Sequence, residues 1–242
     1  MAETWEYFLK IMPAIYEGLE VSIKIFFLTI VLAIPLGLPF ALGSISKIHP
    51  IRWLCRLYIL VFRGTPLMLQ LFFFYFFLPI IFKDVLNNLQ PETKDFIFTY
   101  ILDAFPTAII TFVLNYAAYF AEIYRGGIES IDKGQYEAAQ SLGISKARTM
   151  FGIIIPQTVK RVLPAVTNET ITLVKDTSLV HVIGVGELMK AAKSAVNRDQ
   201  DLLAYGVAAG IYLILTFVLT VLFKHLEKRF SKSEEQGGRK RG

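Results

Sequence analysis

The stretch QYEAAQSLGISKARTMFGIIIP, residues 135–156, is the longest polar piece between hydrophobic segments that still has a helical pattern. A short helix is predicted up to Leu142, because Gly143 can adopt the left-handed conformation that commonly ends a helix. Ser145 is placed to cap a second short helix, which we expect to close at Pro156. A helix, a glycine corner and another helix form a compact unit that is suited to docking.

The chain around this stretch is strongly apolar. It has 242 residues, of which 54% are hydrophobic and 14% aromatic, and its mean hydropathy is +0.51. These values exceed those of an average soluble domain and indicate a membrane protein with several spans. At roughly 20 residues per span, the apolar runs allow about five helices. We predict an all-α membrane protein with spans at residues 19–42, 57–82, 98–123, 163–185 and 203–223. The fourth run is the least hydrophobic, and a hydropathy window alone could miss it.

Lysine and arginine gather on alternate connections between these runs. They are frequent in residues 47–56, in residues 125–161 and from Lys224 onward, whereas the other connections mix a few of them with many acidic residues. The positive-inside rule then places the N-terminus outside, and the 134–156 loop and the C-terminus inside. The expected organisation is an external interfacial segment, a transmembrane domain and a basic cytoplasmic tail, at residues 1–18, 19–225 and 226–242.

Several classes of site have no support in the sequence. The net charge of +5 reflects topology and attraction to anionic lipid, so we expect a lipid bilayer around the chain and no nucleic acid. Cys55 is the only cysteine, and the three histidines lack metal-ligand spacing. The glycine pairs do not fit the phosphate-binding pattern G-x-x-x-x-G-K-[ST]. We predict no catalytic residue, metal ligand or cofactor in this chain, so that ATP hydrolysis would require a separate subunit.

Four motifs carry a family resemblance. Glu137-Ala138-Ala139 with Gly143, followed by Ile153-Ile154-Ile155-Pro156, resembles the EAA loop of ABC importer permeases, although that pattern has leucine where this chain has Ile155. Three further stretches resemble signatures of the polar amino acid permeases: Phe62-Arg63-Gly64-Thr65-Pro66-Leu67, Ala118-Tyr119 with Glu122 to Ile128, and Leu173 to Leu179. The four occur in the family's order and cover roughly residues 60 to 190.

The resemblance implies the permease subunit of a type I ABC importer for polar amino acids in a prokaryotic plasma membrane. It implies two paired permease chains, identical or not, above a dimer of ATPase subunits that bind ATP and Mg, and an extracytoplasmic solute-binding protein on the other side. Residues 134–156 would be the coupling helix, seated in a cleft of the ATPase. The implied coupling residues are Glu137, Ala138, Ala139 and Gly143.

Charged residues inside the predicted spans suggest where cargo binds, because a charge at membrane depth is costly unless it is paired, hydrated or functional. Glu169, Thr172 and Asp176 recur at helical spacing and share one face of the fourth span. Asn115, Tyr119 and Glu122 do so on the third span, and the two faces could enclose a passage. The candidate substrate residues are Asn115, Glu169, Lys175 and Asp176.

The chemistry of these candidates favours a basic amino acid. Lys175 suits an α-carboxylate, and the two acidic residues suit an ammonium or guanidinium group. A structural reading remains open, in which Lys175 pairs with Asp176. Glu122 is expected to pair with Arg125 or Arg161, and Arg63 to cap a helix or snorkel toward water.

Another class of function is a passive channel or a proton-coupled carrier. Glu169, Lys175, Asp176 and His181 would then relay ions, and the protein would transport amino acids without an ATPase. A membrane scaffold that transports nothing is a third reading, and the charges inside the spans argue against it.

Overall fold

The computed structural model describes the backbone of residues 2–239 and the side chains of residues 4–228, and the described backbone is helical throughout apart from its connections. The helices are α1 Ala2–Ser44, α2 His49–Gly64, α3 Leu67–Phe72, α4 Leu78–Ile81, α5 Lys83–Asn87, α6 Pro91–Tyr100, α7 Ala104–Glu129, α8 Lys133–Ser141, α9 Lys146–Thr149, α10 Ile155–Asp176, α11 Leu188–Asp199 and α12 Leu203–Arg239. Two π-helical turns, Phe73–Phe77 and Met150–Ile154, and a 3-10 helix, Thr177–Ile183, complete the order.

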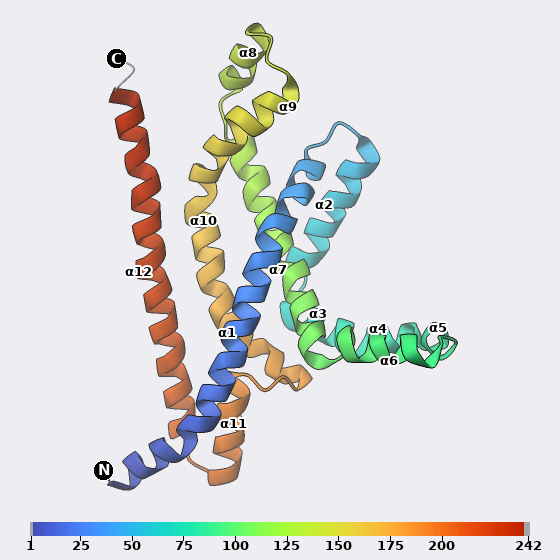
Figure 1. Ribbon diagram of the computed structural model, residues 1–242, viewed down its shortest axis with the longest axis vertical. Helices are drawn as coiled ribbons and strands as arrows, with labels where there is room; N and C mark the ends of the chain where they lie inside the picture. The colour runs from blue at the N-terminus through green and yellow to red at the C-terminus, as the bar shows by residue number, and fades with distance from the viewer. Residues whose placement is uncertain (1, 240–242) are drawn as a thin grey trace.

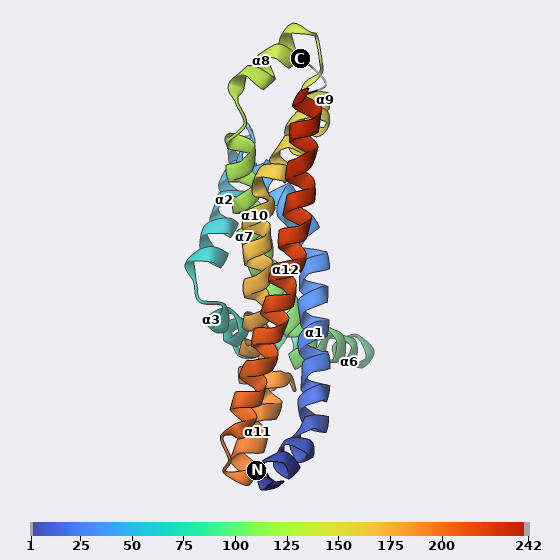
Figure 2. The ribbon, with the colours of Figure 1, turned by 90° about the vertical axis from the view of Figure 1, so that its left-hand side faces the viewer.

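Helices α1, α7, α10 and α12 run lengthwise through the molecule, as Figures 1 and 2 show. The α1–α7 contact is the most extensive of all, and α10 packs against both α7 and α12. The α8–α9 unit lies at the same end as the C-terminal end of α12, whereas α11 and the start of α1 lie at the opposite end (Figure 1). Helices α3 to α6 project sideways from this bundle (Figure 1).

Three helices of the described chain are long and apolar enough to cross a membrane: Thr4–Ser44, Ala104–Glu129 and Leu203–Lys228. A fourth span is possible if His49–Gly64 and Leu67–Ile81, which are bent by 105° at a short break, count as one. The prediction of an all-α protein with membrane-spanning helices is confirmed. The predicted segment 1–18 is not separate in the part described, because its described residues form the first part of helix α1.

The structure corrects two of the predicted spans. Residues 57–82 do not form one straight helix, because the chain turns sharply between Gly64 and Leu67. The run 98–123 is interrupted as well, since α6 ends at Tyr100 and α7 begins at Ala104. Pro106 lies in the first turn of α7, where its missing N–H leaves no bond unmade.

The predicted fourth span corresponds to α10 and the 3-10 helix that follows it. This segment is less apolar than the three long helices because it carries charged residues, as the sequence led us to expect. It nevertheless packs between α7 and α12. Its role as a fifth span, and the sidedness of the termini, stay predictions.

Small residues bring the central helices close together. A Cβ on Gly37 of α1 would lie 2.8 Å from the Cβ of Phe120 and 3.1 Å from the backbone nitrogen of Ala121. Two turns farther along α7, a Cβ on Gly127 would lie 2.2 Å from Val162 Cγ1 of α10. Such close approach is what drives helix association in a membrane, where the surrounding lipid is as apolar as the side chains.

A buried carboxylate ties three helices together at the α11 end. Glu187, which is fully buried, accepts hydrogen bonds from the backbone N–H groups of Met189 and Lys190 at 2.8 and 2.7 Å and so caps α11. It also accepts from Tyr212 Oη of α12 at 3.0 Å and from Ser22 Oγ of α1 at 3.4 Å. The carboxylate therefore links α1, α11 and α12.

Candidate functional site

The break between α2 and α3 shapes the site, and its cause is local. Pro66 has no N–H and disfavours helical backbone in the residue before it. Thr65 accordingly is extended, with φ −120° and ψ 144°. The carbonyl of Phe62 would bond the N–H of residue 66 in a continuous helix, so at this proline it needs another donor.

Two amide side chains supply that donor. Asn115 Nδ2 of α7 donates to the Phe62 carbonyl at 2.9 Å, and Gln70 Nε2 of α3 donates to it at 2.8 Å. Gln70 also donates to the carbonyl and hydroxyl of Thr65, and its Oε1 accepts from Asn115 at 3.0 Å. Both amides are buried. The two amides hold the break against α7. Gln70 was not among the site residues that the sequence predicted.

Beside this break lies a cavity of about 560 Å³, here called the polar cavity. Its walls come from the break, α7 and α10, and it is lined by Arg63, Gly64, Thr65, Pro66, Leu67, Asn115, Tyr116, Tyr119, Glu169, Thr172 and Asp176. The two polar faces predicted for neighbouring helices thus do enclose a common space.

The two acidic residues of the polar cavity differ in their partners. Asp176 accepts a hydrogen bond from Tyr116 Oη at 2.7 Å. Glu169 is half-buried and has no hydrogen bond or ion pair with any side chain of residues 4–228. Sequence reasoning passed over Tyr116, although its place three residues before Tyr119 on α7 was an available signal. Of the two carboxylates in the polar cavity, Asp176 is thus hydrogen-bonded to a described side chain and Glu169 is not.

Of the four predicted substrate residues, three meet in the polar cavity and one does not. Asn115, Glu169 and Asp176 line it, whereas the Lys175 side chain is exposed and lies outside its lining. Within the described side chains Lys175 makes no ion pair with Asp176, so the alternative of a structural pair is not seen there. The cation that does line the cavity is Arg63.

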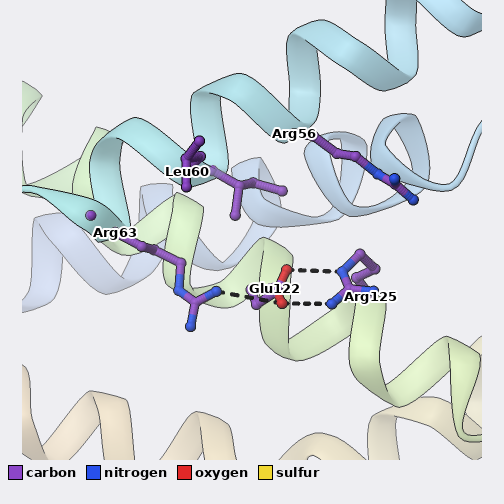
Figure 3. Close-up of a pocket in the computed structure, with 7 residues that line it drawn as sticks. Arg56, Leu60, Arg63, Glu122 and Arg125 are labelled. Atoms are coloured by element: carbon purple, nitrogen blue, oxygen red, sulfur yellow. Dashed lines mark hydrogen bonds and ion pairs between the residues drawn. The ribbon is translucent and has the colours of Figure 1, made fainter.

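A second cavity, of about 540 Å³, adjoins the first and is here called the basic cavity. Arg63 and Gly64 belong to both, and the remaining lining residues are Arg56, Ile59, Leu60, Glu122 and Arg125. Figure 3 shows Glu122 between Arg63 on one side and Arg125 on the other. Three arginines against one glutamate give this cavity an excess of positive charge.

Glu122 has one close partner and one distant partner in the basic cavity. It accepts from Arg125 Nε at 2.9 Å and from Arg125 Nη2 at 2.6 Å, as predicted. Arg63 Nη1 is 3.5 Å from the same carboxylate, and its guanidinium lies 5.4 Å from the centre of the Tyr119 ring. Arg161, the other predicted partner, instead donates to the carbonyl of Ser130.

The predicted docking unit is a separate feature at the α8–α9 end (Figure 1). Gly143 has a φ of 70° and ends the first helix in the left-handed conformation, and Ser145 Oγ caps α9 by accepting from Arg148 N at 3.4 Å. The prediction that the second helix closes at Pro156 was wrong. The π-helical turn Met150–Ile154 leads straight into α10, whose first turn contains Pro156.

The four predicted coupling residues lie on the first helix of this unit and its corner. Glu137, Ala138 and Gly143 are exposed, whereas Ala139 is buried. Leu142, next to the corner, is 77% exposed, which makes an apolar tip. Ile128, Ile131 and Ile154 form a buried cluster, against which Tyr136, Met150 and Leu42 pack, and this cluster fixes α8 and the π-helical turn to α7 and α1. Burial raises the pKa of Tyr136.

The described residues contain no group of three or more His, Cys, Asp or Glu that could hold a metal ion. The two cavities present carboxylates, guanidinium groups, an amide and hydroxyls. A cavity with both signs of charge, enclosed between helices, can bind a small ion that carries both signs itself.

Comparison with known proteins gives consistent results. Residues 33–232 match the family described as binding-protein-dependent transport system inner membrane component. The arginine transport system permease protein ArtQ of Bacillus subtilis (strain 168) is 38% identical over 223 residues, which are 92% of this chain and 94% of that protein. The L-cystine transport system permease protein TcyB of the same strain is 36% identical, over 91% of this chain and 88% of that protein. A crystal structure described as an amino acid ABC transporter with histidines is 34% identical, with a TM-score of 0.77, over 92% of this chain and 96% of that one.

Proposed function

The chain belongs to the family of binding-protein-dependent transport system inner membrane components and is the permease subunit of an amino acid ABC importer; on this premise we propose that it conducts basic amino acids, driven by ATP that a separate subunit hydrolyses. The single observation that carries the choice of cargo is the placement of Glu169 and Asp176 on one cavity.

Charge in the polar cavity supports a cationic side chain on the cargo. Two carboxylates and one guanidinium line it, so that its formal charge is negative when all three are ionised. An amino acid with an uncharged side chain brings one ammonium and one carboxylate group and leaves this excess unbalanced. Arginine, lysine or protonated histidine brings one more positive charge. At about 560 Å³ the cavity lies within the range of roughly 300–1,000 Å³ that is usual for small-ligand sites.

The relatives support an amino acid but differ among themselves in the one they are named for. ArtQ is named for arginine and TcyB for L-cystine, at similar identity to this chain. The preference for arginine-like cargo therefore rests on the carboxylates of this chain together with the ArtQ likeness.

The family likeness supports the remaining parts of the proposed importer. Exposed Glu137 and Ala138 and the apolar tip at Leu142 would seat in the ATPase dimer, which holds ATP and Mg. A second permease chain, identical or not, would pair with this one in a prokaryotic plasma membrane. A solute-binding protein would dock at the opposite, α11 end.

The test is the ATPase activity of this chain purified with its cognate ATPase in lipid nanodiscs, measured with each of the standard amino acids. Basic amino acids should stimulate hydrolysis, and Glu169→Gln or Asp176→Asn should abolish their advantage over glutamine. Glu92→Gln on α6, which lies outside both cavities, is the matched control and should leave the preference unchanged. Stimulation that requires a binding protein and survives both substitutions would move the selection of cargo away from these helices.

A further inference from the structure

Arg63 stands at the wall that the two cavities share. It is one of the two residues that line both, the other being Gly64, which has no side chain. Its position is set by the break beside it, because Asn115 and Gln70 bind the carbonyl of the preceding residue, Phe62. The arginine is therefore carried on a backbone that is held in place from two sides.

A capping role would leave a signature that is not seen. An arginine at the end of a helix can donate to the last carbonyl groups and favour the helix dipole. Arg63 donates no hydrogen bond to any described carbonyl, and its charged neighbour is a carboxylate on another helix, Glu122 of α7. Its side chain is 39% exposed. The guanidinium group of Arg63 therefore lines the two cavities and does not cap helix α2.

The pair with Glu122 is loose and leaves the guanidinium free to bind something else. Charge-assisted N–H···O bonds are usually about 2.7–2.9 Å long, whereas Arg63 Nη1 lies 3.5 Å from Glu122 Oε1. Arg125 already donates to both carboxylate oxygens of Glu122. If Arg63 moved away, Glu122 would keep a complete partner, so that the cost of breaking this contact is small.

We propose that Arg63 binds the α-carboxylate of the transported amino acid, and that it exchanges its loose contact with Glu122 for that carboxylate. This inference rests on the proposed function, in which an amino acid enters the polar cavity. The planar fork of arginine can hold both oxygens of a carboxylate, which a lysine cannot do. Glu169 and Asp176 then face the positive groups of the cargo from α10, across the cavity from the break.

Two features of the cavities make Arg63 the residue for this role. Lys175, the other cation predicted for the carboxylate, is exposed outside the lining, so Arg63 is the one cation among the described residues that lines the polar cavity. Arg63 also lines the basic cavity, so the same guanidinium can hold a carboxylate from either side of the shared wall. The closely paired Glu122 and Arg125 line the basic cavity and keep their contact when Arg63 moves.

The experiment compares each amino acid with the amine that lacks only its carboxylate. The purified permease–ATPase complex in nanodiscs, without binding protein, is titrated with arginine and agmatine, lysine and cadaverine, and histidine and histamine. The concentration for half-maximal ATPase stimulation is recorded for each. In the unmodified complex the amino acid should be favoured over its amine by roughly ten- to a hundredfold, the worth of a hydrogen-bonded charge pair.

Variants on one helix separate recognition from structure. Arg63→Gln should bring the ratio of amino acid to amine close to one, chiefly by weakening the response to the amino acid. Arg63→Lys should give an intermediate ratio, because it keeps the charge and loses the fork. Arg52→Gln is the matched control: Arg52 lies on the same helix, α2, and lines neither cavity, so the ratio should stay that of the unmodified complex.

The outcomes distinguish two kinds of failure. If the amino acids stimulate hydrolysis and the ratio persists in both Arg63→Gln and Arg63→Lys, Arg63 does not bind the carboxylate and the inference is overturned while the proposed function stands. If a variant weakens amino acid and amine equally, its effect is structural and the inference is overturned as well. If no amino acid stimulates the unmodified complex, the proposed function fails and this inference falls with it.

Discussion

Asn115 donates a hydrogen bond of 2.9 Å to the carbonyl of Phe62, which lies 53 positions earlier in the chain. That carbonyl needs an outside donor because the residue four positions after Phe62 is Pro66. The asparagine therefore completes a backbone that a proline has interrupted, and it does so at the wall of the polar cavity. Both Nδ2 hydrogens have acceptors, one in the Phe62 carbonyl and one in Gln70 Oε1.

Removing this amide should loosen the break. Asn115→Ala leaves Gln70 Oε1 without its donor in a buried position, and we expect a loss of stability of about 1–3 kcal/mol. The measurement is the thermal unfolding of the purified permease–ATPase complex. Asn168→Ala, at an exposed position of α10, is the control and should leave the midpoint unchanged. Equal midpoints for both variants would contradict the role given to Asn115.

The tether between α7 and α10 can be tested in the same assay. Tyr116→Phe removes only the hydroxyl that donates to Asp176 at 2.7 Å. Because a hydrogen bond to a charged group is worth about 1.5–3 kcal/mol, the variant should unfold at a lower temperature. The half-buried Tyr75 has no hydrogen-bond partner among residues 4–228, so Tyr75→Phe should behave like the unmodified protein. A similar shift in both variants would show that the loss is not due to the Asp176 bond.

Two adjacent glycines provide a matched pair for helix packing. A Cβ on Gly127 would meet Val162 Cγ1 at 2.2 Å and Thr158 Cγ2 at 2.9 Å, whereas a Cβ on Gly126 meets nothing within 4 Å. Valine and threonine have restricted rotamers and cannot easily turn away. Gly127→Ala should therefore destabilise the α7–α10 contact by about 1–3 kcal/mol, and Gly126→Ala should not. If thermal unfolding ranks the two variants the other way, α7 and α10 do not approach as described.

The docking unit should couple ATP hydrolysis to uptake. Gly143→Val places a β-branched residue at a φ of 70°, which costs about 1–3 kcal/mol and should displace the corner. Glu137→Lys reverses an exposed charge on α8. We expect both variants to assemble with the ATPase and to hydrolyse ATP without uptake of radiolabelled amino acid into proteoliposomes.

The control for this coupling test is Gly206→Val on α12, where a Cβ meets nothing within 4 Å and the backbone needs no glycine. It should keep both activities. Normal uptake by Glu137→Lys and Gly143→Val together would refute the assignment of α8 as the coupling element.

The ion pair at the opposite end predicts a response to acid. Arg198 and Lys10 donate hydrogen bonds to Asp199 and hold the pKa of its carboxyl well below its usual value. A lowered pKa in the folded state means that the contact stabilises the protein above the unfolded pKa of about 3.9 and is lost as the pH falls through the folded value. The link between α1 and α11 should thus persist at pH 4 and fail only in stronger acid.

Trp5 emission in a Trp53→Phe background reports on this end of α1. It should be constant from neutral pH down to about pH 4 and change below it, and Asp199→Asn should remove that acid step. An unchanged acid step in Asp199→Asn would assign the response to another group.

Local rules predicted those features of the molecule that depend on neighbours within one helical turn. The left-handed Gly143, the Ser145 cap, the apolar character of the spans and the shared face of Glu169, Thr172 and Asp176 follow from spacing and residue type, and the structure contains them. Glu122 with Arg125 is of the same kind, since the two are three positions apart on one helix.

The tertiary structure decided which of several locally permitted arrangements the chain adopts. Pro156 can follow one helix or begin another, and the packing of Ile154 against Ile128 and Ile131 selects continuation into α10. Lys175 and Arg63 are both plausible partners for a carboxylate by residue type, yet only Arg63 lines the polar cavity, because the rotation of α10 turns Lys175 outward and the break at Pro66 places Arg63 at the wall. The bond from Asn115 to Phe62 and the bond from Tyr116 to Asp176 join residues far apart in the chain. Such contacts depend on how whole helices rotate and approach one another, and no spacing within a single helix specifies that.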